Sequence, residues 1–265
     1  MSASIHFERT DKVGVITINR PEKMNSLDFS ANDELVAVWQ QIRDDPGINV
    51  ALITGAGHQA FCAGADLKTY TMSYATTPAP EFRNRFSEGP GFGGITRNLQ
   101  VNKPILAAIN GYAISGGLEL ALACDIRFCS PQAEFALQDV GWGFHACDGG
   151  LVRLKEIVGL GNAMEIILSG DRFDAEHALR IGLVNRVIDD KTLLSESMDY
   201  AVHLASRAPL AQQFAKDVMA RAHGMTLTEA LKLESMSFHN LGQTKDLDEG
   251  TTAFREKRKA NFRGK

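Results

Sequence analysis

Two glycine-containing stretches decide the fold of this chain: AFCAGADLK at residues 60–68 and NGYAISGGLELALACD at residues 110–125. Each follows an apolar run and leads toward a helix-like segment, so free main-chain N–H groups and a helix dipole can face a bound oxygen. Either stretch alone would most often serve only the turn, because glycine tolerates the backbone angles that tight turns need. The meaning of the pair therefore depends on the surrounding sequence.

The residues before and between the two stretches alternate between strand and helix patterns. Runs rich in β-branched residues at 13–19 and 49–54 predict strands. Between them, apolar side chains recur at helical spacing, and Ser30 with Asp33 provides a plausible N-terminal cap. These apolar residues are Leu35, Val38, Trp39 and Ile42. Further strands are expected at residues 105–110, 125–130 and 133–137, with a helix over the GGLELALAC segment.

The pattern changes after about residue 149, where helical signals follow one another and the only strand candidate is LVNRVI at 183–188. Helices are expected at residues 191–207, 209–223 and 227–241. We therefore predict a mixed α/β core at residues 1–190 and a C-terminal helical region at 191–265. The Pro- and Gly-rich stretch at 71–94 predicts a loop, which either covers a site or only connects two elements.

Composition narrows the classes of function. The 265 residues carry a formal net charge of −4, which gives no general attraction to nucleic acid or to an anionic membrane. The four cysteines form no CxxC pair and no metal-ligand spacing, so we expect no metal site and a reducing, cytoplasmic setting. The first twenty residues show no signal- or transit-peptide pattern, and the apolar stretch at 104–126 is interrupted by Asn110 and Glu119. We expect neither export nor a membrane span.

Three segments together resemble the crotonase superfamily, which contains the enoyl-CoA hydratases and isomerases. They are AFCAGADLK, KPILAAINGYAISGGLELALACD at residues 103–125, and EGTTAFREKRKANF at residues 249–262. The resemblance covers nearly the whole chain, beginning at ITINRPEKMNSLD (16–28). It implies a crotonase-like ββα superhelix with a C-terminal helical trimerisation region. It also implies a homotrimer or homohexamer acting on an acyl-CoA thioester, with coenzyme A as part of the substrate and no other cofactor.

The resemblance also assigns roles to residues. The two amides of the family's oxyanion hole fall on Ala65 and Gly116, and fixed donors of this kind suit the enolate oxygen that forms at a thioester. The family's acyl-CoA contacts fall on residues near the first turn and in the basic C-terminal run. These are Ala63, Asp66, Leu67 and Lys68 near the turn, and either Lys257 or Lys259 in the basic run. A solvated helix face is the ordinary meaning of such a basic run.

Two acids are expected to move protons. Glu119 follows Gly116 by three residues, so a helix places its carboxylate near that amide, and its apolar neighbours indicate burial. The second catalytic Glu of the family falls on Asp139, whose side chain is one methylene shorter. A misplacement of ~1 Å can cost ~10²-fold in rate. Three roles therefore stay open for Asp139: a working acid in a reshaped site, a weakened acid, or only a cap for the turn that follows.

The segment at residues 142–148 departs from the hydratase pattern. Cys147 is either a nucleophile at a helix N-terminus or a small buried side chain, and Asp148 is expected to cap the following helix. His145 either shuttles protons or has no chemical role. Trp142 and Phe144 suggest a pocket for a bulky or aromatic acyl group, although core packing explains them equally well.

We therefore predict an enoyl-CoA hydratase-like enzyme that adds water to a 2-enoyl-CoA. The alternatives are a double-bond isomerase, which needs one good carboxylate, and a hydrolase or lyase using the altered turn around Cys147. A non-enzymatic alternative is an RNA-binding relative, which the acidic net charge and Glu119 disfavour. A fold resemblance alone does not choose among these reactions.

Overall fold

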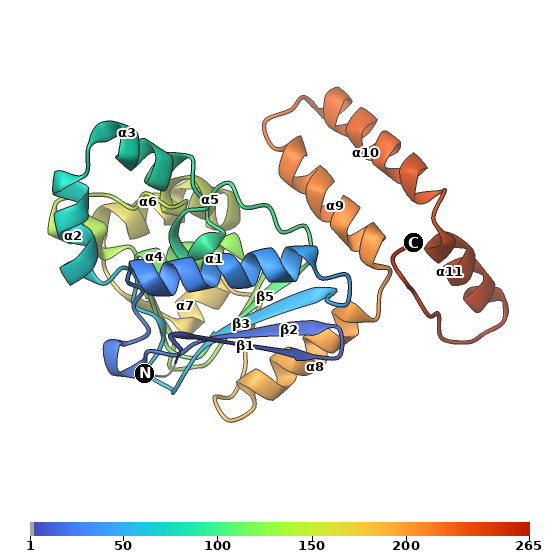
Figure 1. Ribbon diagram of the computed structural model, residues 1–265, viewed down its shortest axis with the longest axis horizontal. Helices are drawn as coiled ribbons and strands as arrows, with labels where there is room; N and C mark the ends of the chain where they lie inside the picture. Colours follow the sequence, from blue (N-terminus) through green and yellow to red (C-terminus); the bar gives the residue numbers. More distant parts are fainter. Residues whose placement is uncertain (1–2) are drawn as a thin grey trace.

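The computed structural model describes residues 3–265 and contains two β-sheets (Figure 1). The larger sheet has the order β1-β2-β3-β5-β7-β10 and the smaller one β4-β6-β8-β9. The strands of the larger sheet are β1 (Ile5–Thr10), β2 (Val13–Ile18), β3 (Val50–Gly55), β5 (Ile105–Ile109), β7 (Ile126–Cys129) and β10 (Arg186–Val187). Those of the smaller sheet are β4 (Ala60–Cys62), β6 (Tyr112–Ile114), β8 (Glu134–Ala136) and β9 (Phe173–Asp174).

A repeated unit builds both sheets. Each of the pairs β3/β4, β5/β6 and β7/β8 places its first strand in the larger sheet and its second in the smaller one. The three pairs are in parallel register with one another in both sheets. A helix follows each pair: α2 (Leu67–Thr76), α4 (Gly116–Ala123) and, after a short 3-10 turn at Gln138–Trp142, α5 (Gly150–Val158). The predicted ββα core is confirmed. The carboxyl ends of β4 and β6 lie side by side and lead directly into the two glycine turns.

Helix α1 (Phe29–Asp44) covers one face of the larger sheet, as Figure 1 shows. Its expected apolar face is confirmed, because Leu35, Trp39 and Ile42 are fully buried. The predicted cap was wrong: Asp28 accepts a hydrogen bond from the Ala31 amide at 3.0 Å, because the helix begins before Ser30. Burying these side chains contributes roughly 1.5–3 kcal/mol each.

The C-terminal half is largely helical. Helices α8 (Leu193–Ala205), α9 (Pro209–Ala222) and α10 (Leu227–Leu241) confirm the three predicted helices, and α11 (Lys245–Arg255) follows them. Helices α6 (Leu160–Ser169) and α7 (Ala175–Arg180) precede them. Helix α8 packs against the larger sheet through Leu193, Ala201 and Ala205, whereas Figure 1 shows α9, α10 and α11 extending to one side. The predicted strand at 183–188 is reduced to the two residues of β10.

The stretch at 71–94 is more ordered than a loop. It contains the end of α2, helix α3 (Ala79–Phe82), a π-helical turn at Arg83–Ser87 and a 3-10 turn at Phe92–Gly94. Asp66 caps α2, and aromatic rings within the stretch pack together, with 4.7 Å between the centroids of Phe82 and Phe86. Aromatic contacts of this kind stabilise a segment whose Gly and Pro content suggests an irregular chain.

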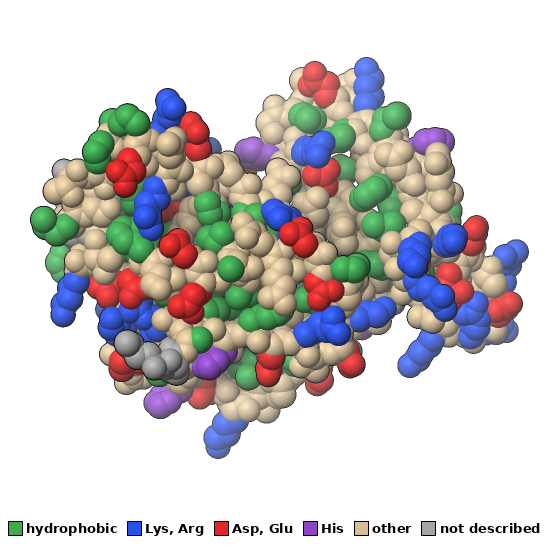
Figure 2. All heavy atoms as spheres, in the orientation of Figure 1, with side chains coloured by type: hydrophobic (Ala, Val, Ile, Leu, Met, Phe, Trp, Pro, Cys, Tyr) green, Lys and Arg blue, Asp and Glu red, His purple; other side chains and the backbone are tan. Residues whose placement is uncertain are grey.

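Acidic and basic side chains alternate over the face in Figure 2, and Lys and Arg gather around α11 and the C-terminal residues. Within residues 3–265, none of the helices combines the length and the apolar content needed to cross a bilayer.

Candidate active site

The two glycine turns predicted from the sequence lie against each other. Gly64 has a φ of +91°, and a Cβ built on it would lie 2.9 Å from the Ile114 carbonyl oxygen and 3.2 Å from the Gly116 nitrogen. Only glycine meets both requirements without strain, because it accepts positive φ and has no side chain. This contact brings the stretch after β4 to the start of α4.

The main chain around Ala65 leaves its amide available to the site. The Leu27 amide donates to the Gly64 carbonyl at 2.9 Å, and the Asp66 amide donates to the Leu27 carbonyl at 2.8 Å. These two hydrogen bonds flank Ala65. In a parallel bridge of this kind the flanked residue directs its own N–H away from the partner strand. Within the described part of the chain, the Ala65 amide has no hydrogen-bond acceptor.

The amide of Gly116 opens helix α4, so it has no acceptor within that helix. Ser115, the residue before it, holds a φ of 48° and a ψ of −117°, an uncommon conformation for a residue with a side chain. The ring of Phe92 packs over Gly116, since a Cβ on Gly116 would lie 2.9–3.1 Å from three ring carbons. The turn therefore presents a helix-start amide beneath an aromatic wall.

Both turns border one cavity of about 180 Å³. Its lining includes the two predicted oxyanion residues, Ala65 and Gly116, and the two predicted acids, Glu119 and Asp139. The remaining lining residues are Ala63, Leu67, Phe92, Ile114, Ser115, Gln138, Trp142, Phe144, Cys147 and Asp148. Residues from three successive ββα units thus converge on one small volume.

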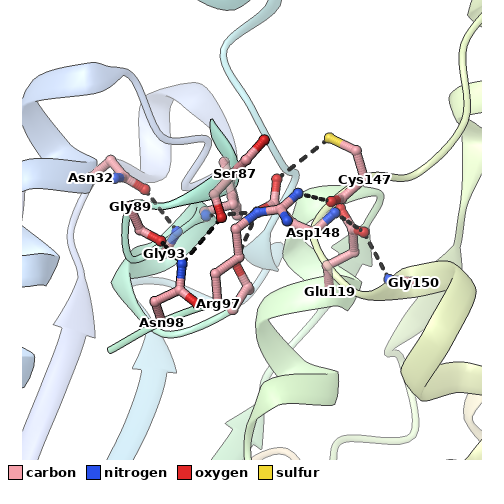
Figure 3. A network of polar contacts seen from close by, with 12 residues as sticks. Asn32, Ser87, Gly89, Gly93, Arg97, Asn98, Glu119, Cys147, Asp148 and Gly150 are labelled. Carbon is pink, nitrogen blue, oxygen red and sulfur yellow. Dashed lines mark hydrogen bonds and ion pairs between the residues drawn. The ribbon is translucent and has the colours of Figure 1, made fainter. Parts of the chain in front are cut away.

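Glu119 is buried beside the cavity, with 3% of its surface exposed. Its Oε1 accepts hydrogen bonds from the backbone amides of Asp148 at 2.6 Å and Gly150 at 2.8 Å (Figure 3). These two bonds fix one oxygen of the carboxyl group and stabilise its charged form. Burial and the nearby Asp148 carboxylate outweigh them and raise the pKa of Glu119 to about 8. A carboxyl group with this pKa exchanges protons near neutral pH.

Asp139 is the second acid of the cavity and is 7% exposed. Its Oδ2 has no hydrogen-bond partner among the described residues. Burial raises the pKa of Asp139, while a hydrogen bond from the Ser115 hydroxyl opposes this shift by stabilising the ionised form. Burial thus raises the pKa of both acids of the cavity, so both favour the protonated form more than an exposed carboxyl group does.

The segment at residues 142–148 forms an outer wall of the cavity. Trp142 and Phe144 line it, yet they are 67% and 42% exposed, so they are not core residues. Cys147 is exposed as a residue, yet desolvation around its sulfur and the carboxylates of Asp148 and Glu119 raise the pKa of the thiol to about 12. The thiol therefore stays protonated near neutral pH, which disfavours the nucleophile among the two roles considered for it.

His145 lies outside the cavity, and Asp148 is not the expected helix cap. The His145 ring contacts the carbonyl oxygen of Ala146 at 2.9 Å and borders an adjoining surface pocket instead of the cavity. Asp148 does not cap α5: the N-cap is Gly149, with no side-chain cap. The carboxylate of Asp148 points instead toward the residues around Phe92, where its Oδ1 accepts the Phe92 amide at 3.0 Å.

The predicted CoA-binding residues fall into two groups. Ala63 and Leu67 line the cavity, and Asp66 caps α2 by accepting the Lys68 amide at 3.1 Å. Lys68 is exposed beside them. Lys257 is exposed just after α11, on the helical extension that Figure 1 shows to one side of the sheets. The chain does not bring Lys257 to its own cavity.

Sequence reasoning missed three contributors to the site: Phe92, the hydroxyl of Ser115 and the carboxylate of Asp148. A signal existed for Phe92, because its flanking glycines in GPGFGG imply tight turns around an apolar side chain. Ser115 adjoins Gly116 in the motif itself. The role of Asp148 depends on residues about fifty positions earlier and left no local signal.

Comparisons with known proteins agree with this geometry. The family model described as enoyl-CoA hydratase/isomerase matches residues 8–265. The chain is 37% identical over 260 residues to the (E)-benzylidenesuccinyl-CoA hydratase of Thauera aromatica, covering 98% of this chain and 99% of that protein. It is 38% identical over 256 residues to the mitochondrial enoyl-CoA hydratase of Pongo abelii, covering 96% and 85%.

Solved structures show the same relationship. The crystal structure of enoyl-CoA hydratase from Mycobacterium tuberculosis H37Rv superposes with a TM-score of 0.90 and 31% identity, covering all of both chains. Enoyl-CoA hydratase from Bacillus anthracis superposes with a TM-score of 0.89 and 33% identity, covering 99% of this chain and 100% of that one.

Proposed function

The chain belongs to the enoyl-CoA hydratase/isomerase family and is an enoyl-CoA hydratase-like enzyme, and from this premise we propose how its own residues perform the reaction. The proposed donors to the thioester oxygen are the amides of Ala65 and Gly116. The observation that carries the proposal is their meeting beside Glu119 and Asp139 in one cavity. Losing one donor of this kind typically costs ~10²-fold or more in rate.

Each acid serves a different atom. In hydration, Glu119 takes a proton from water as the water oxygen bonds to C3 of the enoyl group. The electrons of the double bond move toward the thioester, whose oxygen is held by the two amides, and protonated Asp139 delivers a proton to C2. Hydration ends with the proton on Glu119 and a charge on Asp139, the state from which dehydration of a 3-hydroxyacyl-CoA begins. Before the next hydration, proton exchange with solvent restores ionised Glu119 and protonated Asp139.

We propose a substrate whose acyl group has a bulky or aromatic end, because exposed Trp142 and Phe144 line the cavity. The (E)-benzylidenesuccinyl-CoA hydratase among the relatives has such a substrate in its name. Coenzyme A would enter as part of the substrate, and the scheme uses no other cofactor.

The experiment is hydration of crotonyl-CoA and cinnamoyl-CoA by the purified chain, followed by loss of enoyl-thioester absorbance. Glu119→Gln and Asp139→Asn should each lower kcat by ~10²-fold or more, because each removes a proton carrier. The introduced Gln and Asn side chains each retain an acceptor oxygen, so both variants should still fold. Full hydration by Asp139→Asn would refute the two-acid scheme. Retained double-bond isomerisation of a 3-enoyl-CoA by that variant would instead favour the one-acid isomerase.

We also propose that the chain forms a homotrimer or homohexamer in the cytoplasm. Large apolar side chains on the helical extension support this, since Phe254 is 85% and Phe238 is 76% exposed beside an apolar groove. Lys257 would then reach the nucleotide phosphates of CoA bound to a neighbouring copy. Sedimentation analysis should give three or six chain masses, and a monomer would refute the assembly. Three buried free cysteines, Cys62, Cys124 and Cys129, fit a reducing compartment.

A further inference from the structure

Asp148 joins two parts of the site that the chain builds from distant segments. Its backbone amide donates to Oε1 of Glu119 at 2.6 Å, and its side chain, in a residue that is 7% exposed, faces the opposite way. There the single oxygen Oδ1 accepts the Phe92 amide at 3.0 Å, the Thr96 hydroxyl at 2.9 Å and Arg97 Nε at 3.2 Å. Three donors on one buried oxygen fix the orientation of this carboxyl group.

The segment that Asp148 holds, residues 92–97, forms the wall over the oxyanion turn. Its first residue, Phe92, lays its ring on Gly116, as described above. Helix α1 holds the next residue, since Asn32 Oδ1 accepts the Gly93 amide at 2.7 Å and Trp39 Nε1 donates to the Gly93 carbonyl at 2.8 Å. Asp148 is therefore the anchor that ties this wall to the side of the cavity that carries Glu119 (Figure 3).

Two guanidinium groups compensate the buried charge. Arg97 pairs with the Asp148 carboxylate and also donates from Nη2 to the Cys147 carbonyl. Arg153, on α5, donates from Nη1 to the Asp148 carbonyl at 3.2 Å and from Nη2 to the Thr96 carbonyl at 2.8 Å. A buried carboxylate without such partners would be costly. The two arginines thus connect the segment at residues 92–97 with the turn at Asp148 and with the first turns of α5.

We propose that Asp148 is a positioning residue for the hydratase reaction: its side chain holds the Phe92 wall over the Gly116 amide, while its own amide holds Glu119. One residue thereby sets the distance between the oxygen-binding turn and the acid that works on water. The inference rests on the proposed function, and it adds a group that touches neither the substrate nor the reacting atoms.

The charge of Asp148 has a second effect that a purely structural residue would lack. The ionisable groups facing Glu119 are Asp148, Asp139, Cys147 and Arg153. Among the acids, Asp148 makes the largest contribution to raising the pKa of Glu119 after burial. Removing that charge while keeping the shape should therefore lower the pKa of Glu119.

Two substitutions separate the hydrogen bonds from the charge. Asp148→Asn keeps an acceptor oxygen for the Phe92 amide and removes the charge, whereas Asp148→Ala removes both; the amide that holds Glu119 remains in each. Asp246→Asn is the matched control, because Asp246 is also a buried aspartate, and its carboxylate accepts the Arg263 and Gly264 amides away from the cavity. Far-UV circular dichroism and thermal unfolding establish that each variant is folded.

The first readout is hydrogen exchange, which does not depend on activity. Peptides covering residues 86–98 should exchange hydrogen faster in Asp148→Ala than in the parent chain, because this substitution releases the Phe92 amide. Their exchange in Asp246→Asn should equal that of the parent chain. Unchanged exchange in folded Asp148→Ala would overturn the proposal. This arm remains informative even if crotonyl-CoA is not hydrated, so failure of the anchor and failure of the hydratase assignment are distinguishable.

The second readout is the pH profile of crotonyl-CoA hydration. Asp148→Ala should lower kcat by ~10²-fold, the scale expected for a misplaced site, with a smaller loss in Asp148→Asn. The acidic limb of kcat/KM, which reports the ionisation of Glu119, should move to lower pH in Asp148→Asn and stay in place in Asp246→Asn. A parent-like kcat in Asp148→Ala, or an unmoved acidic limb in Asp148→Asn, would refute the proposal.

Discussion

Gly117 lies directly against Cys62: a Cβ built on Gly117 would stand 1.8 Å from the Cys62 carbonyl oxygen. The second residue of α4 and the last residue of β4 are thus in main-chain contact. Together with the contact between Gly64 and Gly116, this closeness sets the two proposed oxyanion amides beside each other.

Gly117→Ala should abolish this arrangement, because a methyl group cannot share space with a backbone carbonyl and the two elements must separate. We expect a loss of several kcal/mol in stability, at the upper end of single-residue effects, together with loss of hydration activity. Thermal unfolding and a crotonyl-CoA assay measure both. The matched control is Gly161→Ala in α6, where a Cβ meets no atom within 4 Å. That variant should be neutral or slightly stabilised, and equal behaviour of the two variants would contradict the packing argument.

Glu119→Gln should stabilise the chain increasingly as pH rises. The pKa of Glu119 is about 8 when folded against an ordinary 4.5, so the folded chain keeps a proton that the unfolded chain releases within this window. Stability attributable to this group is therefore complete below about pH 4.5 and falls as pH rises toward 8. The Tm difference between Glu119→Gln and the parent should grow from pH 5 to pH 9. Exposed Glu196, replaced by Gln, should give a constant difference.

Cys147→Ala should retain hydration activity. The thiol stays protonated near neutral pH because burial and two acids raise its pKa to about 12, so it is a poor nucleophile. Iodoacetamide should accordingly modify Cys147 slowly at pH 7, as mass spectrometry of the labelled peptide can show. Loss of turnover in the variant, together with rapid labelling, would restore the hydrolase or lyase reading.

Trp142→Ala should alter substrate preference more than stability. Because the side chain is 67% exposed on the cavity wall, its removal leaves no buried hole but takes away a surface for the acyl group. The kcat/KM for cinnamoyl-CoA should fall more than that for crotonyl-CoA. Leu168→Ala, a similarly exposed apolar side chain on α6, should leave the ratio unchanged. A ratio that is also unchanged in Trp142→Ala would show that the ring does not contact the substrate.

Elements with strong local signals could be predicted from the sequence. Helix α10 begins and ends at the predicted residues, because Thr226 and Glu229 form a complete capping box before its apolar pattern. Strands β2 and β3 were found from their β-branched runs. By contrast, β9 has two residues and was not predicted, and β10 keeps only two of the residues predicted as strand at 183–188. Both strands exist because a neighbouring strand offers its edge. Pairing of that kind is not encoded in the short segment itself.

The site divides in the same way. The roles of Ala65 and Gly116 came from the family resemblance. The placement of Glu119 followed from local geometry, since a helix brings a carboxylate three residues after Gly116 near that amide. The location of Asp139 at the cavity depended on the family resemblance. Asp148 was misread as a cap because its real partners, from Phe92 to Arg97, come to it only through the packing of two separate ββα units.

Main-chain donors have an evolutionary consequence. Every residue except proline carries an N–H group, so a codon change at position 65 alters the size of a side chain and leaves the donor in place. Side chains such as Trp142 have no such protection and are free to drift. Proteins that descend from this scaffold can therefore change the side chains that contact the acyl group and still keep the main-chain donors that stabilise the thioester oxygen.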